Sequence, residues 1–205
     1  MANVKIKNFK NTNITLIFSV PLNHLLITQS ALFKLFSTGD AQKDTNNFIE
    51  APGLKVMIFP SQGKEFVFES NRLLINDKSD SAVISSSLIP GFQKILDSGM
   101  VDTKDIVAYG FNYDIAIALD ENTVATFLNP KIVKSLDIKS AGISVTFNRE
   151  GTEYKLQIAP SGQGNDFIAH LNVQYNAHSL PDALALQKDF EAQSEMFKKI
   201  INETL

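Results

Sequence analysis

Residues 107–119, VAYGFNYDIAIAL, decide the fold of this chain. Large apolar side chains occupy every second position and share one face: Val107, Tyr109, Phe111, Tyr113, Ile115, Ile117 and Leu119. Small or polar side chains share the other: Ala108, Gly110, Asn112, Asp114, Ala116 and Ala118. A period of two over this length predicts a long β-strand with one face in the core. The small side chains indicate that another segment approaches the backbone closely, at least at the ends of the strand.

Shorter stretches with the same alternation lie on both sides of this strand. One runs from Ile14 to Val20 and ends at Pro21. Further strands are expected at 54–59, 65–69, 73–76, 141–147, 154–158 and 167–175, with glycine, proline, asparagine or serine in most of the turns. Strands separated by such short turns pair as antiparallel neighbours. We therefore expect a mostly antiparallel sheet of about seven or eight strands.

Helical spacing of apolar residues occurs in several segments. Residues 22–36 and 88–96 predict helices that end at Gly39 and Gly99, and residues 120–128 predict a short helix before Pro130. A final amphipathic helix is expected from Pro181 to about Ile201, with Leu186, Phe190, Phe197 and Ile201 along one side. Residues 39–53, GDAQKDTNNFIEAPG, show no period and predict a mobile loop. The predicted fold class is α+β, with helices packed on one face of the sheet.

The chain has 205 residues, which fits a single domain over 1–205, with a subdivision near 120–138 as the alternative. No internal repeat stands out, although the second half echoes the order of meander and helix in the first. The chain has no cysteine, so disulfides, thiolate metal sites and cysteine nucleophiles are excluded.

Charge and hydropathy limit the classes of partner. The net charge is −3, the arginines are Arg72 and Arg149, and the lysines are dispersed, so we expect no nucleic-acid partner. The N-terminus lacks the apolar segment of a signal peptide, and the nearly apolar run at residues 14–26 is too short and too polar to cross a bilayer. We therefore expect a cytoplasmic protein that does not bind membranes.

The candidate site is the polar face of the sheet. Its residues are Asn112, Asp114, Lys155, His170, Asn172 and Gln174. Two interpretations remain open: a solvated face, which antiparallel sheets commonly have, or a concave polar binding surface. Asparagine is a poor strand former, so several amides in one strand favour a role in hydrogen bonding.

Acid–base chemistry is a further interpretation of the same residues. His170 acts as an acid or base if Asp114 or Lys155 lies beside it, which requires cross-strand contacts. None of the three histidines has the spacing of a metal site, and Gly162 and Gly164 lack the remaining features of a phosphate loop. No metal or cofactor is expected.

Two segments carry a family resemblance. Residues 107–113, VAYGFNY, are similar to the pattern glycine, hydrophobic, any residue, tyrosine, hydrophobic, asparagine, and the sequence departs from it at Asp114. Residues 196–204, MFKKIINET, are similar to a terminal helix with Phe197 and Ile201, although Asn202 replaces a threonine. Both segments resemble a sporadically distributed family of uncharacterised prokaryotic proteins. The resemblance implies a prokaryotic origin and no particular activity.

The function expected from these observations is that of a non-enzymatic binding or interaction protein, with an unknown protein or small molecule as partner and a homo-oligomeric state. The alternative is a small-molecule enzyme of unrecognised type that uses the polar face. A deep pocket that joins His170 and Asp114 would favour the enzyme. A flat polar face with a hydrophobic rim would favour the binding protein.

Overall fold

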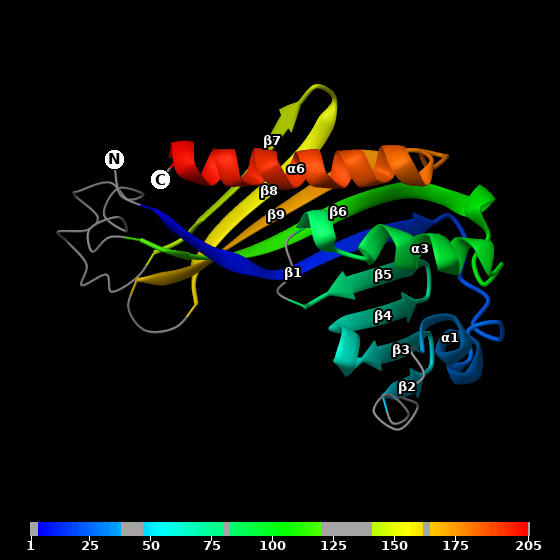
Figure 1. Ribbon diagram of the computed structural model, residues 1–205. Coiled ribbons are helices and arrows are strands. Elements are labelled where there is room, and N and C mark those ends of the chain that lie inside the picture. Colours follow the sequence, from blue (N-terminus) through cyan, green and yellow to red (C-terminus); the bar gives the residue numbers. More distant parts are fainter. Residues whose placement is uncertain (1–3, 38–46, 80–82, 120–140, 162–164, 205) are drawn as a thin grey trace.

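The computed structural model describes residues 4–37, 47–79, 83–119, 141–161 and 165–204. These form one antiparallel sheet of nine strands in the order β2-β3-β4-β5-β1-β6-β9-β8-β7 (Figure 1). The strands are β1 Lys5–Phe18, β2 Phe48–Ala51, β3 Leu54–Phe59, β4 Lys64–Glu69, β5 Arg72–Asp77, β6 Ile106–Ala118, β7 Ile143–Arg149, β8 Thr152–Pro160 and β9 Asp166–Asn176. The α-helices are α1 Gln29–Phe36, α3 Leu88–Asp97 and α6 Ala183–Thr204.

The long strand expected at 107–119 is β6, and it lies near the middle of the sheet between β1 and β9. Its apolar face lies in the core as predicted, and the Phe111 side chain is fully buried. Neighbouring strands place apolar residues opposite it, so that one continuous row crosses the sheet: Phe66, Ile75, Ile14, Phe111, Val173 and Tyr154. All six are buried, which fixes which face of every strand points inward.

The three α-helices named above lie on the side of the sheet that carries this apolar row (Figure 1). The four residues predicted to form the apolar side of α6 are each at most 1% exposed. They are Leu186, Phe190, Phe197 and Ile201. The Phe190 ring lies 5.4 Å from that of Phe111, and the Tyr113 hydroxyl donates to the Phe190 carbonyl at 2.7 Å. The prediction that α6 packs on its own sheet is therefore confirmed.

The expected strand count of seven or eight was too low, because the structure has a ninth strand. This strand, β2, lies inside the segment predicted to be a loop and is built around its apolar pair, Phe48 and Ile49. Pairing with β3 supplies the hydrogen bonds that four residues could not make alone. The earlier part of that predicted loop, residues 39–46, lies outside the described residues.

Two other element boundaries differ from prediction. β1 begins at Lys5, well before Ile14. α1 begins only at Gln29, because the Thr28 hydroxyl caps it by accepting from the Ala31 amide at 3.2 Å. The leucines before the cap are therefore not on a helix, and Leu25 is 86% exposed.

The two halves of the chain follow a similar topology, with five strands in the first half and four described strands in the second. In each half the first strand, β1 or β6, is innermost, and the strands that follow fill the sheet from the outside inward. β5 and β9 then pair with the innermost strands, and a helix, α3 or α6, follows each. The halves meet where β1 and β6 pair in antiparallel register.

The expected helix at 120–128 and the alternative domain boundary near 120–138 fall on residues outside the described ranges. Among the helices described, none is long and apolar enough to span a membrane.

Candidate functional site on the open face of the sheet

The sheet face opposite the helices is called the open face here, and asparagines cross its centre. Asn76, Asn13, Asn112 and Asn172 lie directly opposite one another on β5, β1, β6 and β9. We call these four residues the asparagine row. In each strand a directly neighbouring residue points into the core, so the asparagine points to the open face. The strand register that aligns the core residues therefore also aligns the four amides.

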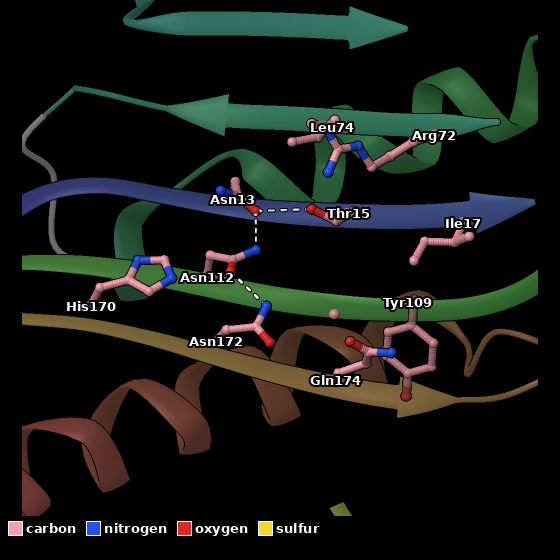
Figure 2. Close-up of a pocket in the computed structure, with 11 residues that line it drawn as sticks. Asn13, Thr15, Ile17, Arg72, Leu74, Tyr109, Asn112, His170, Asn172 and Gln174 are labelled. Atoms are coloured by element: carbon pink, nitrogen blue, oxygen red, sulfur yellow. Dashed lines mark hydrogen bonds between the residues drawn. The ribbon is translucent and has the colours of Figure 1, made fainter. Parts of the chain in front are cut away.

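Hydrogen bonds join three of these amides. Asn172 Nδ2 donates to Asn112 Oδ1 at 2.7 Å, and Asn112 Nδ2 donates to Asn13 Oδ1 at 2.7 Å (Figure 2). The Thr15 hydroxyl also donates to Asn13 Oδ1, at 3.2 Å. Each amide nitrogen carries two protons, and these bonds use one from Asn112 and one from Asn172. The second proton of each has no partner among the described residues.

A second polar row runs beside the asparagine row and contains the predicted acid–base pair. Asp114 lies opposite His170, and His170 Nδ1 donates to Asp114 Oδ1 at 2.7 Å. Asn11 Nδ2 donates to the other carboxylate oxygen at 3.3 Å. The carboxylate therefore fixes the orientation of the imidazole, and in the neutral ring Nε2 is left as an acceptor. The cross-strand contact that this interpretation requires is present.

An open hollow of about 290 Å³ lies over β1 and β6, and its lining also includes residues of β5 and β9 (Figure 2). Gly110 is part of its lining, and an added Cβ there would lie 2.5 Å from the Val173 carbonyl oxygen. The absent side chain of Gly110 thus allows β9 to approach the backbone of β6 closely in the middle of the strand, whereas the close approach was expected at least at its ends. The lining is polar on one side, with Asn112, Asn172 and Gln174, and aliphatic on the other, with Ile17 and Leu74.

The aliphatic side of the hollow continues onto β2–β5. Ile49, Val56, Val67 and Leu74 lie opposite one another, and Ile17 and Ile58 flank them on the same face. These six residues form what we call the aliphatic patch. None of the six belongs to the hydrophobic cluster on the helix side. Five of them are at least partly exposed, whereas Val56 is buried, at 9% exposed. The open face is therefore polar over β6, β9 and β8. Over β2 to β5 it is largely aliphatic, with polar positions at Glu65, Arg72 and Asn76.

The structure brings the predicted site residues together on adjacent strands. Asn112, Asp114, His170, Asn172 and Gln174 lie on β6 and β9, and Lys155 on β8 lies opposite Asn172. His170, Asn112, Asn172 and Gln174 line the hollow, whereas Asp114 and Lys155 lie beyond its lining.

Sequence reasoning missed the contribution of the first half of the chain. Asn13 and Thr15 alternate with Ile14 and Leu16, so their polar face could have been read, but their pairing with β6 could not. Arg72 also lines the hollow. It donates to Glu69 at 2.6 Å and is held at the rim by this ion pair.

The most deeply buried ion pair in the described part of the chain lies away from the open face, between β4 and β5. Lys64 contacts Asp77, whose carboxylate also accepts from Ser79 and Ser86. Burial lowers the pKa of Lys64 despite the neighbouring carboxylate. Burial opposes ionisation of Asp77 too, but the hydrogen bonds from Lys64, Ser79 and Ser86 outweigh it and hold the pKa of Asp77 below its usual value. These shifts concern stability, because the pair supports the hairpin and the start of α3.

The described residues contain no group of histidine, aspartate or glutamate side chains arranged to hold a metal ion. The open face offers hydrogen-bond donors and acceptors, one oriented imidazole and an aliphatic surface. This arrangement can bind a ligand with both polar and apolar parts, and it can move a proton at His170.

Comparison of the sequence with known proteins gives no further guide to the function. No protein-family model matches the chain, and no curated protein matches it. The function is therefore inferred from the geometry of the open face.

Proposed function

We propose that this is a binding protein whose ligand lies on the open face, over the asparagine row and the hollow beside it. The observation that carries the proposal is the alignment of asparagines on four adjacent strands. Strand propensity disfavours asparagine, and a solvated face needs no aligned amides. A row that keeps amide protons available for a ligand explains both the residue type and its placement.

The shape of the open face supports the same proposal. Its hollow is open and lies beside an aliphatic patch, rather than forming an enclosed pocket around His170 and Asp114. The predicted cytoplasmic location, the absence of a nucleic-acid partner and the homo-oligomeric state belong to the same proposal.

A blocking substitution tests this proposal while the ligand is still unidentified. Asn172→Arg places a long side chain in the middle of the asparagine row, and Asn202→Arg places the same side chain on the exposed side of α6. Wild type and both variants are applied to a peptide array and a glycan array. We expect Asn172→Arg alone to lose the ligands that wild type retains. Equal retention by both variants, or no retention by wild type, overturns the proposal.

The His170–Asp114 contact supports a second candidate, a small-molecule enzyme with His170 as general base. The 2.7 Å hydrogen bond holds the ring as a positioned base requires. Hydrolysis of p-nitrophenyl acetate serves as the test, with His178→Ala as the control because His178 is exposed outside the site. A rate that falls in His170→Ala and not in His178→Ala supports the enzyme. Equal rates in wild type and both variants reject it.

A further inference from the structure

We infer that the ligand class of the open face is an extended polypeptide segment with aliphatic side chains. This inference rests on the proposed function and names the class of ligand that the same face would bind. The supporting features are the amide chemistry of the asparagine row, the adjoining aliphatic patch and the lack of features that other ligand classes need.

The amide chemistry matches a peptide backbone. A carboxamide side chain presents a donor and an acceptor in one plane, as a peptide group does, so the two can pair through complementary hydrogen bonds. Asn112 and Asn172 each retain an unused amide proton beside the hollow, and Gln174 adds a further amide at its edge. An extended chain exposes its backbone groups, whereas a folded protein has already paired them.

The aliphatic patch supplies the second part of the match. Leu74 and Ile17 line the hollow directly, and the partly exposed Val67 continues the surface outward from Leu74. A ligand held by the amides near Asn112 therefore reaches this surface within one or two strands. Aliphatic side chains gain free energy there by leaving water, at about 25 cal/mol per Å² of apolar area.

Other ligand classes fit less well. Successive bases of single-stranded nucleic acid stack on aromatic side chains, and the register places no Phe or Tyr side chain on the open face among the described strand residues. Tyr109 borders the hollow, but it belongs to the helix side, where its ring stacks on Tyr175 at 4.7 Å. Phosphate groups bind most readily where several cations lie together. Arg72 at the rim is already paired with Glu69, and Lys155 lies beyond the lining of the hollow.

The length of the row sets the length of the segment. The polar positions run from Glu65 on β4 through the asparagine row to Lys155 on β8, which are five steps between neighbouring strands. At about 4.8 Å per step this is about 24 Å, which about seven extended residues cover. Lys155 is exposed at the polar end, so an acidic residue is favoured at that end of the segment.

The test uses reduced, carboxymethylated α-lactalbumin as a soluble unfolded polypeptide and native α-lactalbumin as its folded control. Binding is measured by isothermal titration calorimetry. Leu74→Ser removes part of the aliphatic patch, and Leu184→Ser is its control because Leu184 is 66% exposed on α6. Asn172→Arg and Asn202→Arg serve as before. Maltoheptaose is titrated into the same proteins as a ligand rich in hydroxyls.

We expect wild type to bind the unfolded polypeptide and not the native protein. Leu74→Ser should weaken binding on the order of tenfold, since one buried leucine contributes about that factor. Asn172→Arg should abolish binding, and the two α6 variants should bind as wild type does. Failure of wild type to bind the unfolded polypeptide, or equal affinity in Leu74→Ser and wild type, overturns the inference.

The titration with maltoheptaose separates the two levels of the argument. If maltoheptaose binds and Asn172→Arg abolishes this, the open face is a binding site but its ligand is a carbohydrate, so only the inference about the polypeptide fails. If Asn172→Arg leaves every measured affinity unchanged, the open face is not the site and the proposed function fails as well.

Discussion

Replacement of the central asparagine of the row, Asn112→Val, is expected to destabilise the protein, whereas replacement of three asparagines together is not. Asn112 makes two cross-strand hydrogen bonds of 2.7 Å, one to Asn13 and one from Asn172. The net value of such a bond is about 1 kcal/mol, so the single substitution forfeits about 2 kcal/mol. The higher strand propensity of valine offsets up to about 1 kcal/mol of this loss in stability. The expected net cost is about 1 kcal/mol.

The triple variant with valine at Asn13, Asn112 and Asn172 leaves no amide without its partner. Each of the two amide–amide hydrogen bonds is lost in two of the three single variants, so the sum of the single effects counts it twice. The triple variant loses each bond only once. The triple variant should therefore be more stable than the sum of the single variants predicts, by about 2 kcal/mol. Because valine is favoured in strands at all three positions, its stability should equal or exceed that of wild type.

Urea unfolding followed by far-ultraviolet circular dichroism measures these free energies, since the chain has no tryptophan for fluorescence. Asn148→Val is the control, because Asn148 is exposed on β7 and on the same face of the sheet. It should show only the small gain from strand propensity. If the three single effects add to the triple effect within about 0.5 kcal/mol, the amides exchange freely with water and the reasoning about the row is refuted.

Three further predictions concern the core. Asp77→Ala leaves the Lys64 ammonium buried without its counter-charge and should cost about 3–5 kcal/mol in urea unfolding, most of which the double variant Lys64→Met/Asp77→Leu should restore. Phe190→Asp should unfold the monomer, seen as loss of the circular dichroism signal. A variant that keeps the wild-type signal would contradict the packing of α6 against the sheet. Burial favours the neutral hydroxyl of Tyr113 and raises its pKa well above the usual value of 10. The contribution of this group to folding stability is therefore present below pH 10 and is lost as the pH rises above 10. Stability in urea unfolding should therefore fall more steeply above pH 10 in wild type than in Tyr113→Phe.

The alternation of residues was enough to predict the strands and the direction of their faces. A period of two assigns β6 and its inward face without ambiguity, because a shift of one residue would place Asn112 and Asp114 in the core. The stripe of α6 was predictable for the same reason, at a helical period. β2 was missed because two apolar residues in a polar segment carry too little pattern, and only pairing with β3 makes them a strand.

The limits at the candidate site have a different physical origin. The polar residues of β6 and β9 could be grouped, and the His170–Asp114 contact could be proposed, because each strand shows its own polar face. Strand order is determined by long-range pairing, so nothing local indicates that Asn13 and Asn76 complete the row. The helix was predicted to begin too early because the leucines before Thr28 have helical spacing. The helix begins only after Thr28, which caps it.

The division of the chain into two halves also bears on how chains can associate. Residues 98–105 join α3 to β6, and this short segment alone carries the chain from one half to the other. The β1–β6 pairing that closes the sheet can form equally well between β1 of one molecule and β6 of a second, with every hydrogen bond retained. Refolding at high protein concentration should therefore yield a domain-swapped dimer that separates into monomers only on unfolding. Shortening the joining segment should raise its yield, because a tighter connection strains the closed monomer and leaves the exchanged form unaffected.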